Sequence, residues 1–119
     1  MQGATRIFVY GTLRRGGSNH GLLAGATFAG PAETREPFAM FDLGGFPCIV
    51  PGGEEPVAGE VFLVDGATLA RLDALEDVPR WYRRAVVLLA DGSQAEAYLY
   101  AQGVGGAPRV PGGDWMRRP

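Results

Sequence analysis

The sequence predicts an α+β fold, a small mixed and mostly antiparallel β-barrel of about six or seven strands with one main helix and short flanking helical turns. Nineteen glycines and nine prolines divide the 119 residues into short segments. Most of these segments are apolar or alternating runs typical of strands, and only residues 67–77 show the spacing of an amphipathic helix. The length suits one core, so residues 1–119 are expected to form a single domain on which a tail, about 103–119, packs.

The first half of the chain is predicted to contain a strand, a loop rich in glycine and arginine, a short helical stretch and three more extended segments. In order, these are expected at residues 5–10, 11–17, 20–23, 26–35, 37–43 and 46–50, with turns at 44–45 and 51–53. Ser18 or Asn19 can cap the helical stretch, because short polar side chains accept hydrogen bonds from the first helical amides. Glycine pairs and Pro-Gly mark the turns.

The second half begins with the strongest strand pattern, VAGEVFLV at 57–64. Asp65, or Asp65 with Gly66, starts the main helix, which is expected to end near Glu76. Two further strands are then predicted, at 82–90 and 94–100. They flank Asp91-Gly92, the best hairpin signal in the chain. A loose segment, 103–113, leads to Asp114-Trp115, whose indole can anchor the tail on the body of the protein.

Composition excludes several classes of function. The net charge is −2 and no basic run exceeds two residues, so nucleic acid is not expected as a partner. All basic residues except one histidine are arginine, which excludes a lysine Schiff base. The single cysteine, Cys48, cannot form an intramolecular disulfide and fits a cytoplasmic location. With one cysteine and one histidine, a zinc site is not expected. Residues 1–7 lack a signal core, and no segment is apolar enough to span a membrane.

Glu76 is placed unusually for a structural carboxylate. On a helical wheel, Leu69, Leu72 and Leu75 mark the apolar face of the segment, and Glu76 falls between Leu69 and Leu72. A carboxylate entering an apolar wall is destabilised when charged, and its pKa rises in response. Such a shift suits a general acid/base near neutral pH.

Structural interpretations of Glu76 remain open at this point. It lies in the last helical turn, where its side chain can reach water, and it could pair with Arg80, Arg83 or Arg84. Asp77 is a rival acid, although the wheel turns it away from the apolar face. Asp73 lies at the edge of that face.

The loop after the first strand, Tyr10 to Gly16, is a second candidate. Gly11 permits backbone conformations that other residues avoid, and consecutive N–H groups in such a loop can converge on an anion. The alternative is an ordinary strand-to-helix turn. It is not a Walker loop, because the Gly-Lys-Ser/Thr ending is missing. His20 and Cys48 could form a nucleophilic pair, but the apolar neighbours of Cys48 indicate a buried structural residue.

Taken together, these segments resemble the gamma-glutamylcyclotransferase-like family, and most closely its small gamma-glutamylamine cyclotransferase branch. The resemblance runs in the right order through nearly the whole chain. The segments that carry it are 8–16 (FVYGTLRRG), 19–20 (NH), 57–62 (VAGEVF), 72–76 (LDALE), 82–84 (YRR), 97–100 (AYLY) and 113–115 (GDW). The tyrosine-glycine-threonine-leucine loop combined with the downstream leucine-glutamate is the most specific part.

The resemblance implies a reaction in which the α-amine of a γ-glutamyl amide attacks its own side-chain carbonyl, giving 5-oxoproline and a free amine. It implies no cofactor and no metal. Glu76 resembles the family's catalytic glutamate, which acts as general base and then as general acid. The implied substrate-binding residues are Tyr10, Gly11, Thr12, Leu13, Tyr82 and Tyr100. Of these, the backbone of 11–13 would bind the α-carboxylate or adjacent oxygens, and the tyrosines would shape the pocket.

The expected partner is therefore a small γ-glutamyl compound, bound by a monomer or weak homodimer. The leaving-group side of the pocket is expected in the variable loops 35–56 and 103–112. An alternative is a non-catalytic small-molecule binding module with the same fold. Glu76 weighs against that alternative, because a binding site for a ligand carboxylate gains nothing from a second carboxylate nearby.

Overall fold

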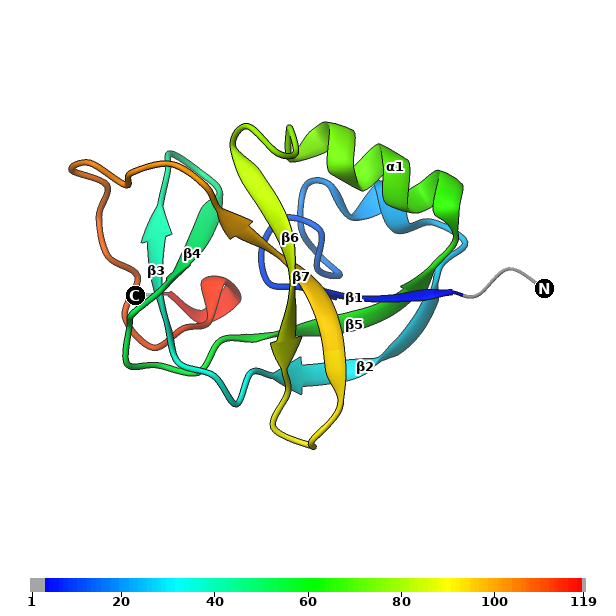
Figure 1. Ribbon diagram of the computed structural model, residues 1–119, viewed down its shortest axis with the longest axis horizontal. Helices are drawn as coiled ribbons and strands as arrows, with labels where there is room; N and C mark the ends of the chain where they lie inside the picture. The colour runs from blue at the N-terminus through cyan, green and yellow to red at the C-terminus, as the bar shows by residue number, and fades with distance from the viewer. Residues whose placement is uncertain (1–3, 119) are drawn as a thin grey trace.

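The computed structural model describes residues 4–118, which fold into seven strands, one α-helix and two short 3-10 helices (Figure 1). Residues 1–3 and 119 lie outside the described residues. They belong to the N-terminal segment 1–7 and to the predicted tail, respectively. The elements are β1 (Thr5–Val9), η1 (His20–Leu23), β2 (Thr27–Glu33), β3 (Phe38–Asp42), β4 (Pro47–Pro51), β5 (Ala58–Val64), α1 (Gly66–Leu75), β6 (Tyr82–Leu88), β7 (Gln94–Tyr100) and η2 (Trp115–Arg117). Each predicted strand and the main helix match these bounds to within two residues.

The α+β class is confirmed, but the sheet is not a closed barrel. Five strands form one sheet in the order β2-β5-β1-β7-β6, in which only β1 and β7 are parallel. Strands β3 and β4 pair with each other in a separate antiparallel sheet. Because β3 and β4 form their hydrogen bonds with each other, they do not bridge β2 and β6, which remain the edge strands of the five-stranded sheet. A single bridge between Thr34 and Leu89 joins the chain just beyond the two edge strands.

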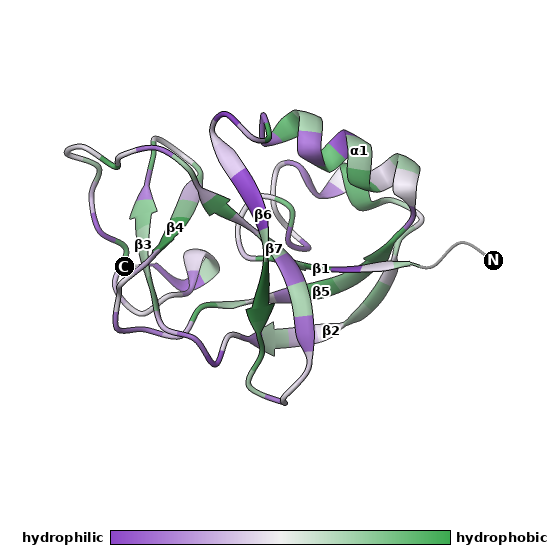
Figure 2. Ribbon diagram, in the orientation of Figure 1, coloured by the Kyte–Doolittle hydropathy of each residue, from purple (hydrophilic) through white to green (hydrophobic). Residues whose placement is uncertain are grey.

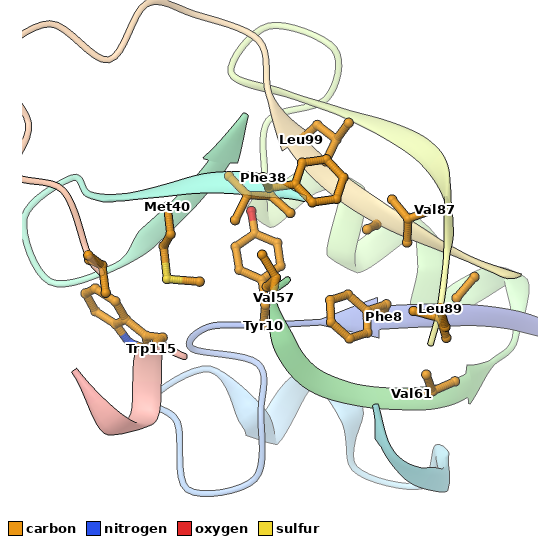
Figure 3. Packing of buried hydrophobic residues seen from close by; sticks show 14 residues of the cluster. Phe8, Tyr10, Phe38, Met40, Val57, Val61, Val87, Leu89, Leu99 and Trp115 are labelled. Carbon is orange, nitrogen blue, oxygen red and sulfur yellow. The ribbon is translucent and has the colours of Figure 1, made fainter. Parts of the chain in front are cut away.

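The second part of β1, residues 7–9, is buried on both faces of the sheet, which explains its continuous apolar sequence. Phe8 and Tyr10 point into one hydrophobic cluster, together with Phe38, Met40 and Trp115 from β3 and the tail (Figure 3). Ile7 and Val9 point into a second cluster on the opposite face. The loop that leaves β1 therefore begins from a fixed strand, and this fixes the position of the candidate site.

Helix α1 lies over the second cluster, where Leu72 is completely buried. The helix carries both hydrophobic and hydrophilic residues (Figure 2). Its buried face is narrower than the wheel predicts, because Leu69 is only partly buried and Leu75 is 41% exposed. Asp65 caps the helix as predicted, since its Oδ1 accepts the Thr68 N–H at 2.8 Å.

The C-terminal end of α1 is a Schellman turn. The Asp77 N–H donates to Ala74 O at 3.2 Å, and the Val78 N–H donates to Asp73 O at 3.0 Å. Asp77 has a φ of 52°, a left-handed conformation that costs a non-glycine residue about 1 kcal/mol. This turn ends the helix at Glu76, its C-cap residue, and sends the chain away from it.

The tail packs against the body of the protein. Trp115 is 4% exposed within the first cluster, and the Ala58 N–H donates to Gly113 O at 2.9 Å. A side chain at Gly113 would overlap Pro56 O, so glycine is required there. Within residues 4–118, no helix is long and apolar enough to cross a membrane.

Candidate active site

A cavity of about 540 Å³ opens beside the end of α1. Its walls come from the loop after β1, the turn between β3 and β4, the C-terminal end of α1, and strands β6 and β7. Most of the predicted site residues line it, namely Tyr10, Thr12, Leu13, Glu76, Tyr82 and Tyr100. Gly11 is not among the lining residues.

Glu76 faces this cavity without a charged partner. Its carboxylate makes no hydrogen bond or ion pair with any residue between 4 and 118. Burial alone raises the pKa of Glu76 from 4.5 to about 7. Arg84 pairs instead with Asp73 and Glu96, each at 3.0 Å. Ion pairing with that arginine, one of the structural interpretations of Glu76, is therefore not found.

Tyr10, Tyr82 and Tyr100 line the same cavity as Glu76. The Tyr10 hydroxyl donates to Tyr98 O at 2.7 Å, and the Tyr82 hydroxyl donates to Pro47 O at 3.1 Å. Burial, with a smaller contribution from Glu76, raises the pKa of both phenols. They are therefore neutral, and since their protons are engaged, their oxygens can act only as acceptors. Tyr100 packs edge-on against Tyr82, with ring centroids 5.3 Å apart.

Two residues of the loop after β1, Thr12 and Leu13, line the same cavity and carry backbone amides without a partner among residues 4–118. The explanation predicted for Gly11 is wrong, because its φ is not positive. Glycine is required at this position because a Cβ would overlap the ring of Pro47. Gly11 thus allows the loop to lie close to Pro47, but it does not itself line the cavity.

Four side-chain contacts hold this loop, two of them from distant segments of the chain. The Arg15 N–H donates to Glu60 Oε1 on β5 at 2.8 Å, and Arg14 pairs with Asp114 in the tail at 2.7 Å. The remaining two are the bond from Asn19 Nδ2 to Thr12 Oγ1 at 2.9 Å and that between His20 Nδ1 and Leu13 O at 3.0 Å. The loop is therefore rigid before any ligand arrives, and binding costs little ordering entropy.

Asn19 has a role different from the one predicted, and His20 has a role that was not predicted. Asn19 occupies the N-cap position of η1, but its side chain makes no capping bond and holds Thr12 instead. His20 holds the loop rather than pairing with Cys48. Burial raises the pKa of the Cys48 thiol to about 11, so it is not an activated nucleophile. Residues 4–118 contain no group of three or more potential metal ligands.

The Arg14–Asp114 pair offers a test of the rigid loop. We expect Arg14→Gln to lower the free energy of unfolding by about 1–3 kcal/mol, because a carboxylate that is only 22% exposed then loses its nearest charged partner. A urea titration measures the change. Arg117→Gln is the matched control, since Arg117 lies 4.0 Å from the same carboxylate but is 87% exposed. It should change stability by less than about 0.5 kcal/mol; equal losses in the two variants would contradict a special role for Arg14.

The two loops in which the leaving-group side of the pocket was predicted contribute unequally to the cavity. Loop 35–56 contributes Leu43, Gly45, Phe46 and Pro47, whereas no residue of 103–112 lines the cavity. Leu75 and Trp81 also line it. Both lie within the segment that carries Glu76, and no sequence pattern indicated their position at the opening.

The chain matches the family model described as "Gamma-glutamyl cyclotransferase, AIG2-like" over residues 7–117. A protein of Vibrio cholerae, provisionally named a gamma-glutamylcyclotransferase, is 45% identical over 112 residues, which cover 94% of this chain and 96% of that protein. The gamma-glutamylcyclotransferase family protein YtfP of Escherichia coli K12 is 38% identical over 113 residues, covering 95% of this chain and 97% of its own length.

Solved structures with the same fold include an AIG2-like protein of Mus musculus, with a TM-score of 0.79 and 31% identity. The superposition covers 98% of this chain and 85% of the mouse chain. An uncharacterised protein of Pyrococcus horikoshii superposes with a TM-score of 0.78 and 32% identity, over 93% of this chain and 89% of that chain. The fold, the length of the match and the sequence identities agree, and the chain belongs to the gamma-glutamyl cyclotransferase, AIG2-like, family.

Proposed function

We propose that this protein cyclises γ-glutamyl amides to 5-oxoproline and releases the amine, with Glu76 as general acid/base. One observation carries the proposal: an unpaired, half-buried carboxylate with a pKa near 7 shares a cavity with the free amides of Thr12 and Leu13. A zwitterionic γ-glutamyl group needs an acceptor for its ammonium protons and donors for its carboxylate. The cavity supplies both.

In the proposed complex, the substrate α-carboxylate accepts hydrogen bonds from the amides of Thr12 and Leu13. The ammonium group then faces Glu76 and the phenol oxygens of Tyr10 and Tyr82. Anchoring both groups bends the flexible glutamyl chain, so that its α-nitrogen approaches the Cδ carbonyl. Because the attack is intramolecular, holding this bent conformer lowers the barrier substantially.

The chemistry then moves two protons through Glu76 and needs no redox step. Glu76 takes a proton from the α-ammonium, and the freed nitrogen attacks the carbonyl carbon to form a ring C–N bond. Glu76 returns this proton to the leaving nitrogen, and the tetrahedral intermediate collapses as the original C–N bond breaks. The ring nitrogen then gives its second proton to Glu76, which passes it to the released amine. A carboxyl group with a pKa near 7 can serve in both directions at neutral pH. The products are 5-oxoproline and the ammonium form of the amine, and Glu76 is again a carboxylate.

The test is to incubate the protein with a panel of γ-glutamyl amides and to measure 5-oxoproline by mass spectrometry. We expect turnover of γ-glutamylamines and none of their N-acetylated forms, because acetylation removes the nucleophile. Free acetylglutamate from an acetylated substrate would show hydrolysis in place of cyclisation. Ligand binding without any product would favour the non-catalytic binding module.

A further inference from the structure

The opening of the cavity is apolar and exposed, unlike its floor. Phe46, Leu75 and Trp81 line the cavity and are 44%, 41% and 40% exposed. They represent half of the six large exposed hydrophobic residues found within 4–118. Isolated exposed apolar side chains are ordinary, but a cluster around one opening marks a surface that binds something.

The three side chains come from separate segments that converge here. Phe46 lies in the turn between β3 and β4, Leu75 is the last residue of α1, and Trp81 directly precedes β6. Trp81 is held in place by stacking on Tyr100, with ring centroids 6.4 Å apart. The opening is therefore a partly fixed surface.

The charges around the cavity limit what can occupy this opening. Among the lining residues, which all lie within 4–118, the only charged ones are Glu76 and Asp77, and both are acidic. Arg80 does not line the cavity; its guanidinium lies 5.4 Å from the centre of the Trp81 ring. A carboxylate on the leaving group would meet two acids and no base among the residues that line the cavity, which is unfavourable.

We propose that Phe46, Leu75 and Trp81 form a leaving-group subsite that binds the hydrocarbon part of an apolar alkyl or arylalkyl amine. This inference rests on the proposed function and adds the residues and the chemistry that select the amine. Burying an apolar leaving group against these three side chains removes hydrocarbon surface from water on both sides of the contact. A small amine such as methylamine leaves most of that surface exposed.

The experiment compares three substrates that share the γ-glutamyl group. They are γ-glutamyl phenethylamide, γ-glutamyl methylamide and γ-glutamylphenylalanine, the last of which differs from the first only by a carboxylate. We expect kcat/KM for the phenethylamide to exceed each of the others by at least about tenfold, the scale of a few methylenes in a hydrophobic pocket. Production of 5-oxoproline is the readout.

Variants then locate the selectivity. Trp81→Ala should lower the phenethylamide-to-methylamide ratio of kcat/KM by at least about fivefold, and Phe46→Ala provides a second test if the first variant folds poorly. Val86→Ala is the matched control, because Val86 is 61% exposed and does not line the cavity. It should leave the ratio unchanged.

The outcomes separate the two proposals. Equal kcat/KM for all three substrates, or an unchanged ratio in both Trp81→Ala and Phe46→Ala, would overturn the subsite and leave the cyclisation intact. A preference for γ-glutamylphenylalanine would also overturn it. No 5-oxoproline from any of the three would overturn the proposed function, and the subsite with it.

Discussion

Replacing Glu76 by glutamine is expected to lower the turnover of a γ-glutamyl amide by at least about a hundredfold. Glutamine keeps the size and the hydrogen-bonding shape of the side chain, but it can neither take the proton from the substrate ammonium nor return one to the leaving nitrogen. The residue lies at the cavity wall with no other partner within 4–118, so substrate affinity should change less than kcat. Steady-state kinetics on purified variants measure both.

Asp77→Asn is the matched control for Glu76→Gln. It removes one carboxylate from the same cavity at the neighbouring position, and asparagine tolerates the left-handed conformation that Asp77 adopts. Its activity should remain within about threefold of the wild-type value. If Glu76→Gln were active and Asp77→Asn inactive, the acid/base would be Asp77, and our assignment of Glu76 would be wrong.

The elements and the position of Glu76 could be predicted because both depend on local sequence. The turns are marked by glycine and proline, and one helical wheel places a carboxylate on an apolar face. The same signal was present at Glu60, an acidic residue inside the most apolar strand, and it was missed. Glu60 is 6% exposed and accepts the Arg15 amide. An acidic residue inside an apolar strand can therefore indicate a side chain that accepts a hydrogen bond from the backbone of a neighbouring loop.

What could not be predicted depends on contacts far apart in the chain. Asp114 holds Arg14 across 100 positions, and no local pattern pairs an arginine near the start with a tail residue. The requirement for Gly11 arises from Pro47, which reaches it only through the β3–β4 hairpin. The predicted closed barrel was wrong for the same reason. The alternation of apolar and polar residues predicts that a segment is a strand, but it does not specify that β3 pairs with β4 and not with the larger sheet.

The stability of the protein should depend on pH through Glu76, and the sign distinguishes its two interpretations. Burial raises the pKa of the folded carboxyl from 4.5 to about 7, so the folded state binds more protons than the unfolded state between these values. Stability contributed by this group is therefore present at low pH and is lost as pH rises towards 7. A carboxylate in a structural ion pair would show the opposite dependence.

The measurement is the difference in unfolding free energy between Glu76→Gln and the wild type at several pH values, because other titrating groups cancel in it. From about pH 5 to pH 8 we expect the variant to gain about 2–3 kcal/mol relative to the wild type. The wild-type kcat/KM should rise over the same range, since the base form of Glu76 that destabilises the fold is the form that accepts the substrate proton. A constant difference would show that folding does not raise the pKa of Glu76. A variant that loses stability relative to the wild type as pH rises would show that folding lowers this pKa. Either result would contradict a carboxyl group poised for proton transfer near neutral pH. If stability and activity change in opposite directions over one pH range, the destabilising burial of this carboxylate is retained for its chemistry.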